Sequence, residues 1–536
     1  MPNNIICTNS VSHGKRLYKQ MSLEVAVRNP ERYASLLKIF YEFNGILLDD
    51  EGILNIFSQL YIEGFLTAVN IDFSMMSKDD IKKYIKKNNT HNNEWGFPSG
   101  YQAAFTRYLK TLSEFGFIYS QYNQTFKISP IGEAFALGFI QPSEAFAVQA
   151  LRFWRKSPYR RVLNDFNYFE FVLKVLEKLN NKNKRMSYIQ FLVSLFSDSG
   201  DADDFVSELE KMSFGTDVDK AYEYVVNKYS EIDELHGKAS IQSSAFRDYG
   251  NTVFRVLQLT GFINVEYDGI MLLSLNKNRY DFLKDLIALD RSISEEAKEN
   301  EYRYFIEIGS YPKTIQNIIK KYKEKENYST ANYNSKIPNI LSSYGLDKQK
   351  LAEYLMDVSN DKKDTKQFWF IQAPIKFEFL LTLYLYTCYG DEYEYKPNFK
   401  CDDIGIPYSH APGNIGDIEV FNNTFYWLLE ATLIRNKTQQ LNNETVNLVR
   451  HIDEKAKGSK FLELVAPFIH DDTSLMLRTA SLISMIEKKE LRFYSKASST
   501  EEFIKEAASK ENASVIKNYT EDTFKGIQEL LKEYLK

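Results

Sequence analysis

Apolar residues recur every three or four positions over much of this chain, which predicts helices that each bury one face. One such helix is expected from 99 to 115, and Gly116 follows it in the position of a helix C-cap. From 117 to 128, apolar and polar residues alternate around a polar turn, a pattern that predicts a β-hairpin. A helix closed by glycine and followed by a hairpin is typical of a winged helix-turn-helix.

The same order recurs further along the chain. Apolar positions from 245 to 260 have helical spacing, Gly261 ends the segment, and two β-like runs meet at Asp268 and Gly269. We therefore expect two winged-helix-like units in a mainly helical N-terminal region. Winged helices bind either DNA or other proteins, so the pattern alone leaves both functions open.

The placement of positive charge favours DNA as the partner. The net charge of the chain is −5, so contacts with DNA phosphates require local basic patches. Cations alternate with Trp154 and Tyr159 between 152 and 161, although a solvated helix end and turn would also explain this stretch. The residues expected to contact double-stranded DNA are Arg107, Lys110, Arg152, Arg155, Lys156, Arg160, Arg161, Arg247 and Arg255.

A chain of 536 residues is too long for one hydrophobic core, and its pattern of apolar and charged residues changes twice along its length. We expect a DNA-recognition region at 1–290, a charged connector at 291–345 and a mixed α/β domain at 346–536. The three cysteines form no CxxC pair, which argues against a disulfide framework or structural zinc and indicates a reducing cytoplasm. No apolar run is long enough to cross a membrane, and the first residues lack the pattern of a signal peptide.

Two carboxylates mark a predicted hairpin in the last third of the chain. Asn422 and Asn423 form good turn chemistry between two apolar runs. Asp417 opens the first expected strand, and Glu430 interrupts the second. An ionised carboxylate among large apolar side chains is unfavourable unless a cation pairs with it or a metal binds it. Both a structural salt bridge and a metal site would satisfy this pattern.

Further acids favour the metal site. Glu378 lies in an otherwise apolar predicted helix, and Glu444 and His451 are two helical turns apart. Two carboxylates about 4 Å apart repel by roughly 4 kcal/mol at an effective dielectric of about 20, and a divalent cation relieves that repulsion. Oxygen ligands without thiolates favour Mg²⁺ over Zn²⁺.

These acids belong to a set of short motifs near the C-terminal end. The motifs are Ala-Pro-Gly-Asn-x-Gly-Asp417-Ile-Glu419, Glu430-x-Thr432, Glu444 with Arg450 and His451, and Val465-Ala-Pro-Phe-Ile-His-Asp-Asp-Thr473. With them the chain resembles the AlwI-type restriction endonucleases, and the resemblance extends over most of its length.

The resemblance implies a type IIS enzyme, whose N-terminal region recognises a short asymmetric duplex site and whose C-terminal domain cuts a few base pairs away. That domain would have the PD-(D/E)xK nuclease fold and use Mg²⁺ held by Asp417 and Glu430. The residues implied to complete the catalytic site are Glu378, Glu444 and His451.

One position departs from the general nuclease motif. Thr432 stands where the motif has a lysine, so the sequence does not identify the group that activates the attacking water. Glu444, His451, the metal alone and Lys437 are the alternatives.

Two other functions are compatible with the sequence. Because relatives differ in whether they dimerise, the chain also fits a strand-specific nicking enzyme or the large subunit of a heterodimeric enzyme. Its partner at cleavage would then be a transient homodimer mate or a small nuclease subunit. A non-catalytic DNA-binding regulator with two winged helices is the alternative of another class. The joint presence of Glu378, Asp417, Glu430 and Glu444 counts against that regulator.

Overall fold

The computed structural model describes residues 17–68, 71–88, 100–160, 162–212, 214–229, 248–326, 332–362, 367–410, 415–435, 437, 440, 452, 459–488 and 493–534. The chain divides into two compact units, one made of Met1–Val265 with Gly269–Glu324 and the other of Glu266–Asp268 with Lys325–Lys536. The main boundary therefore falls within the stretch that the sequence assigns to a connector, and that stretch carries helices.

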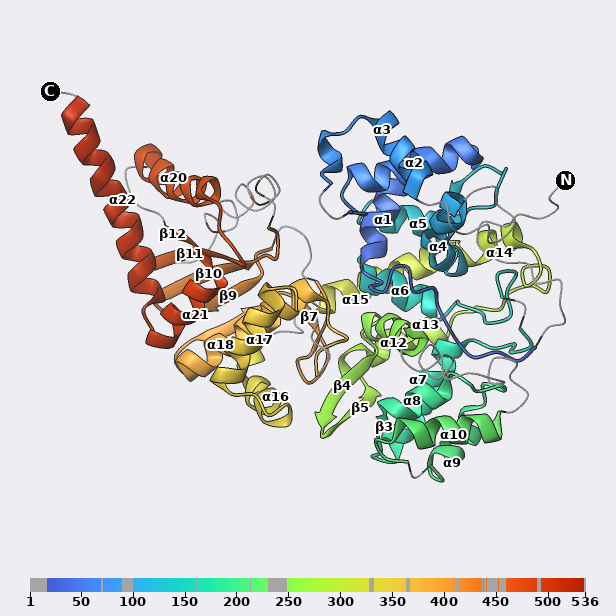
Figure 1. Cartoon of the computed structure of the whole chain (residues 1–536). Helices are drawn as coiled ribbons and strands as arrows, with labels where there is room; N and C mark the ends of the chain where they lie inside the picture. Colours follow the sequence, from blue (N-terminus) through green and yellow to red (C-terminus); the bar gives the residue numbers. More distant parts are fainter. Residues whose placement is uncertain are drawn as a thin grey trace. The chain divides into compact units, whose positions relative to one another are not determined.

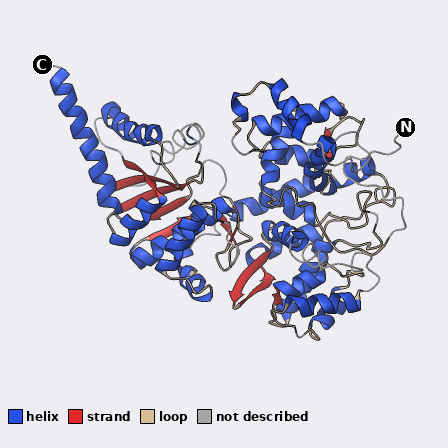
Figure 2. Ribbon diagram, in the orientation of Figure 1, coloured by secondary structure: helices blue, strands red, loops and turns tan. Residues whose placement is uncertain are grey.

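The first unit is mainly helical (Figure 2). Its helices are α1 (Arg32–Tyr41), α2 (Asp50–Ile62), α3 (Lys78–Asn88), α4 (Gly100–Glu114), α5 (Pro130–Ala136), α6 (Pro142–Ala150), α7 (Tyr168–Asn181), α8 (Tyr188–Ser194), α9 (Ala202–Leu209), α10 (Val218–Lys228), α12 (Gly250–Leu259), α13 (Tyr280–Ile287), α14 (Glu301–Ile308) and α15 (Lys313–Glu326), the last of which crosses the boundary. Side-chain caps define several starts: the carboxylate of Asp49 accepts from the N–H of Gly52 at 2.8 Å, for example.

Both predicted helix–hairpin segments are present. Gly116 after α4 and Gly261 after α12 each have a φ of 68°, the left-handed conformation that ends a helix without strain when the residue is glycine. The strands that follow are β1 (Ile118–Tyr119) and β2 (Lys127–Ile128), then β4 (Ile263–Asp268) and β5 (Ile270–Leu275). In addition, β5 pairs antiparallel with β3 (Met186–Ser187), which gives a sheet of order β3-β5-β4.

The second unit is built on a mixed sheet. Within the described residues, its order is β12-β11-β10-β9-β6, and Figure 1 shows the first four of these strands side by side. Pairing is antiparallel from β6 to β10 and parallel from β10 to β12. The strands of this sheet are β6 (Glu394–Pro397), β9 (Ile418–Phe421), β10 (Phe425–Ala431), β11 (Ser459–Ala466) and β12 (Tyr494–Ser499). A separate antiparallel pair consists of β7 (Lys400–Cys401) and β8 (Pro407–Ser409). The helices are α16 (Ile337–Ser343), α17 (Lys348–Ser359), α18 (Ala373–Tyr389), α20 (Asp471–Lys488), α21 (Thr500–Ser509) and α22 (Asn512–Tyr534).

Helices cover both faces of this sheet. Alternate residues of each strand point to opposite sides, so each face has its own set of side chains for a helix to pack against. On one face, Leu428 of β10 and Leu464 of β11 pack with Leu477 of α20 in a buried cluster. On the other face, the rings of Trp427 and Phe503 of α21 lie 6.2 Å apart, and α18 contacts β10. The second unit is thus a mixed α/β domain, the fold class that the sequence predicts for this part of the chain.

No helix in the described part of the chain combines the length and apolar character needed to span a membrane.

Candidate active site

Asp417 and Glu430 meet at one end of the β9–β10 pair. Ile418 pairs with Leu429, so the next pair in register is Asp417 with Glu430. Opposite side chains of an antiparallel pair share one face, with Cβ atoms about 4.5–5.5 Å apart. The N–H of Ala431 donates to Asp417 Oδ2 at 2.8 Å and holds that carboxylate beside the strand. The hairpin predicted from the sequence is therefore present, with both acids at the same end.

The glycine before Asp417 leaves room around the carboxylate of Glu430. A Cβ on Gly416 would lie 2.4 Å from Leu428 Cδ1 and 3.0 Å from Glu430 Oε1, so any side chain here would displace one or both. Glu430 is only 7% exposed, whereas Asp417 is half-buried. Two carboxylates that share one face at the end of a strand pair supply hard oxygen ligands, a donor set that fits a divalent cation such as Mg²⁺.

The other predicted site residues are less closely tied to this pair. Glu378 is buried in α18, and its Oε1 lies 4.0 Å from Nδ1 of His410, a residue that the sequence reasoning missed. His410 directly precedes the Ala-Pro-Gly-Asn motif, which was the available signal. Glu444 and His451 lie outside the described residues. Among the residues that are described, no group of three or more His, Cys, Asp or Glu side chains is placed to hold a metal.

The two positions weighed for the missing lysine have defined partners. The N–H of Thr432 donates to Val465 O at 3.0 Å, and its Oγ1 accepts from the N–H of Ile434 at 3.2 Å. Lys437 forms an ion pair of 2.8 Å with Asp472 in the first turn of α20, and this partner raises the pKa of Lys437.

The sequence reasoning also missed a polar group beside Asp417 and Glu430, which together form the acid pair. Glu419 is buried, and its Oε1 accepts from Lys396 Nζ at 3.1 Å and from Asn398 Nδ2 at 3.2 Å. Its Oε2 accepts from the hydroxyl of Tyr426 at 2.9 Å. The two-residue spacing from Asp417 in a strand was a signal that both acids share a face. The partners on and after β6 carried no such signal, because only strand pairing brings them there.

The basic stretch at 152–161 lies partly inside the first unit. Arg152 is 9% exposed and donates to the carbonyl oxygens of Ser310 at 2.7 Å and Glu307 at 2.6 Å, just beyond and within the last turn of α14. Arg155 is 2% exposed and donates to a backbone carbonyl at 2.9 Å. These two guanidinium groups hold segments of the fold together.

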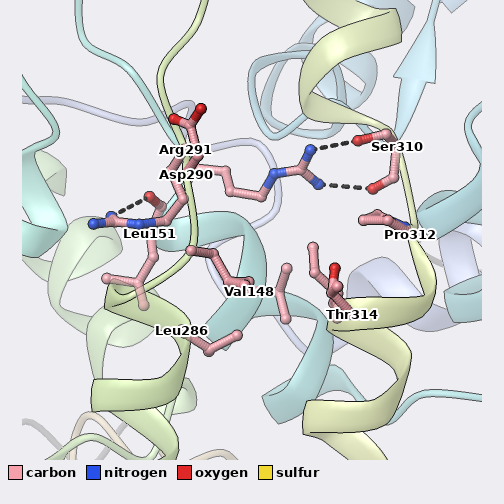
Figure 3. A pocket seen from close by; sticks show the side chains of 11 residues that line it. Val148, Leu151, Leu286, Asp290, Arg291, Ser310, Pro312 and Thr314 are labelled. Atoms are coloured by element: carbon pink, nitrogen blue, oxygen red, sulfur yellow. Dashed lines mark hydrogen bonds between the residues drawn. The ribbon is translucent and has the colours of Figure 1, made fainter.

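Arg152 and Arg291 line a cavity of about 290 Å³ in the first unit (Figure 3). The guanidinium of Arg291 donates to Leu151 O at 2.9 Å and pairs with Glu170 at 2.7 Å. Much of the remaining wall is apolar, with Val148, Leu286, Leu289, Pro312 and Ile315. Both guanidinium groups are thus engaged by protein atoms, and the cavity lies in a different unit from the acid pair.

The remaining basic residues are half-buried where the structure describes them. Arg160 forms two hydrogen bonds of 3.0 and 2.9 Å with the carboxylate of Glu114. Lys156 pairs with Asp165 at 3.3 Å. Arg107 and Lys110 lie on α4 and Arg255 on α12, whereas Arg161 and Arg247 lie outside the described residues. Contact of these cations with DNA stays a prediction.

The acid pair lies within a stretch with a recognisable sequence profile. The profile of the AlwI restriction endonuclease family matches residues 113–369 and 348–504, which together are more than half of the chain. The chain belongs to the AlwI restriction endonuclease family. Both Asp417 and Glu430 fall in the second matched range, and as a family member the protein is a restriction endonuclease.

Two solved restriction endonuclease structures are also similar to this family member. The small subunit of the heterodimeric enzyme R.BspD6I is 22% identical over 31% of this chain and 79% of its own, with a TM-score of 0.24. FokI is 10% identical over 94% of this chain and 97% of its own, with a TM-score of 0.24. No curated protein sequence matches the chain.

Proposed function

We propose that this AlwI-family protein is a type IIS restriction endonuclease. Its first unit binds a short asymmetric duplex site, and its second unit hydrolyses phosphodiester bonds a few base pairs away in a Mg²⁺-dependent reaction. The observation that carries this proposal is the cross-strand pairing of Asp417 with Glu430 at one end of β9 and β10.

In the proposed mechanism, Asp417 and Glu430 would together bind Mg²⁺ through their carboxylate oxygens. The N–H of Ala431 holds the Asp417 carboxylate in place, and burial restricts the rotamers of Glu430. When bound, the ion would supply positive charge against a phosphate oxygen and lower the pKa of a water molecule. The orientation or deprotonation of that water would fall to Glu444, to His451 or to the metal alone.

The fold of the second unit supports a PD-(D/E)xK nuclease domain. The acid pair lies at the end of two adjacent strands in a mixed sheet that is covered by helices on both faces. Glu378 of α18 would add a carboxylate from a covering helix, and Thr432 stands in place of the usual lysine.

The fold of the first unit supports DNA recognition by winged-helix-like units. In the second helix–hairpin segment, β3 leads into α8, and the hairpin that follows α12 returns to pair with β3. This closes the helices and the hairpin into one compact module. Half-buried Arg107 and Lys110 on α4 and Arg255 on α12 are the cations we propose to contact DNA from these units.

Single substitutions of the acid pair test this proposal. Asp417→Asn and Glu430→Gln keep the side-chain size and remove the charge that would bind Mg²⁺. Loss of a residue that merely supports a metal ligand already costs about 10–100-fold, so we expect plasmid cleavage to fall by more than about 100-fold. DNA binding in Ca²⁺, measured by gel shift, is expected to remain. Glu394→Gln is the matched control, because this carboxylate is exposed on β6 of the same sheet.

The outcomes separate the candidate functions. Cleavage by either acid variant at the rate of the control would refute the assigned active site. If the wild-type protein binds DNA but does not cut it in the presence of any divalent cation, the result would instead support the non-catalytic regulator. Linear product indicates cleavage of both strands, whereas open-circular product indicates a nicking enzyme or a chain that needs a nuclease partner.

A further inference from the structure

Asn398 lies next to Asp417, on the side away from Glu430. Pro397 of β6 pairs with Ile418 of β9, and the N–H of Asn398 donates to Asp417 O at 2.8 Å. The register therefore sets Asn398, Asp417 and Glu430 in one row across three neighbouring chain segments. Residues in such a row share one face of the sheet.

The side-chain amide of Asn398 has a fixed orientation. Its Nδ2 donates to Gly416 O at 2.5 Å and to Glu419 Oε1 at 3.2 Å. A carbonyl and a carboxylate can only accept hydrogen bonds, so the amide nitrogen must face both of them. Its two hydrogens are thereby used, and a carboxylate or an apolar side chain at this position would lose both bonds.

These bonds hold the main chain on each side of the Asp417 side chain. Asn398 binds the carbonyl of Gly416 with its side chain and the carbonyl of Asp417 with its own N–H. Glycine has the widest choice of backbone angles, so Gly416 alone would leave the following carboxylate free to shift. The bond from Ala431 to Asp417 Oδ2 therefore acts on a main chain that Asn398 has already fixed.

The same amide also helps to hold a neighbouring negative charge. Glu419 lies on the face of Asp417 and is bound by Asn398, by Lys396 at 3.1 Å and by the hydroxyl of Tyr426 at 2.9 Å. These bonds draw its two oxygens toward β6 and β10. Glu419 is thus held in place as a partner of Lys396. Asp417 and Glu430 are then the two carboxylates that would bind the divalent cation.

We propose that Asn398 is a positioning residue that sets the affinity of the Asp417–Glu430 pair for a divalent cation. This inference rests on the proposed function. Asn398 acts through Gly416, Asp417 and Glu419 and does not itself bind the cation.

The test compares cation binding with cleavage in Asn398→Ala. Mn²⁺, a hard ion like Mg²⁺, is titrated into the full-length protein without DNA and followed by electron paramagnetic resonance. We expect affinity to fall by about 10–100-fold, as for other residues that support metal ligands. The Mg²⁺ concentration at half-maximal plasmid cleavage is expected to rise by a similar factor, with cleavage recovering at high Mg²⁺.

Two further variants make the result specific. Asn398→Asp keeps the size and the backbone N–H but sets an oxygen against Gly416 O and Glu419, so the same loss is expected; it decides the question if the alanine variant does not fold. Asn422→Ala is the matched control at the other end of the same hairpin, where Asn422 Oδ1 accepts from the N–H of Thr424 at 3.0 Å. This variant is expected to bind Mn²⁺ like the wild type.

The failure of this inference is distinguishable from that of the proposed function. Wild-type Mn²⁺ affinity in both Asn398 variants, combined with weak binding by Asp417→Asn, would overturn the positioning role and leave the proposed function intact. If Asp417→Asn itself binds Mn²⁺ and cuts as the wild type does, the proposed function fails and the inference falls with it.

Discussion

Replacing Glu463 by glutamine is expected to stabilise the second unit in mildly alkaline solution. Glu463 is fully buried in β11, where it lies next to Leu429 in register and therefore on the face opposite to Glu430. The hydroxyl of Ser498 donates to its Oε1 at 2.6 Å. Burial raises the pKa of the Glu463 carboxyl from 4.5 to about 8, and the nearby Glu506 adds to the increase.

The sign and size of the effect follow from proton linkage. Between pH 4.5 and about 8, the folded protein keeps a proton on Glu463 that the unfolded chain releases. The contribution of the protonated Glu463 carboxyl to the free energy of unfolding is therefore fully present below pH 4.5. It is lost as the pH rises through this interval, by about 1.4 kcal/mol per pH unit. From about pH 6 to about pH 8, the wild type should lose about 2 kcal/mol relative to the glutamine variant, whose amide is uncharged at both values.

Urea unfolding of the full-length protein at these two pH values measures this difference. Hydrogen exchange of peptides from β11, read by mass spectrometry, reports on the second unit. Glu529→Gln is the matched control, because it removes the same charge from an exposed position on α22 of the same unit. If the free energies of unfolding of the wild type and Glu463→Gln differ by the same amount at both pH values, the conclusion that Glu463 is buried as a neutral carboxyl is refuted.

Two further substitutions test packing. In Gly416→Ala, a Cβ would lie 2.4 Å from Leu428 Cδ1 and 3.0 Å from Glu430 Oε1; we expect a loss of about 1–3 kcal/mol in urea unfolding and a higher Mg²⁺ requirement in plasmid cleavage. An unchanged Mg²⁺ requirement would show that the glycine does not protect the site. Arg160→Met leaves the carboxylate of Glu114, only 1% exposed, without its paired cation, so unfolding should become easier by about 3–5 kcal/mol. Weaker DNA binding with unchanged stability would instead identify Arg160 as a DNA contact.

The sequence by itself determined the features that depend on near neighbours. Alternating apolar residues around Asn422 and Asn423 specify a hairpin, and in that hairpin a carboxylate at 417 and another at 430 fall at the same end. Helical spacing followed by Gly116 or Gly261 likewise predicted the two helix–hairpin segments that the structure contains. Such patterns are legible because turn chemistry and side-chain period act over a few residues.

Only the tertiary structure decided which distant residues surround the acid pair. Asn398 and Lys396 reach Asp417 and Glu419 through the pairing of β6 with β9, and nothing in their local sequence specifies that partner strand. Burial was decided in the same way. Arg152 belongs to a stretch that is basic in sequence, yet its guanidinium is turned inward because backbone carbonyls at the C-terminal end of α14 can accept its hydrogen bonds. Strand partners and the balance between solvent and buried acceptors are set by the whole folded chain, so no local pattern reveals them.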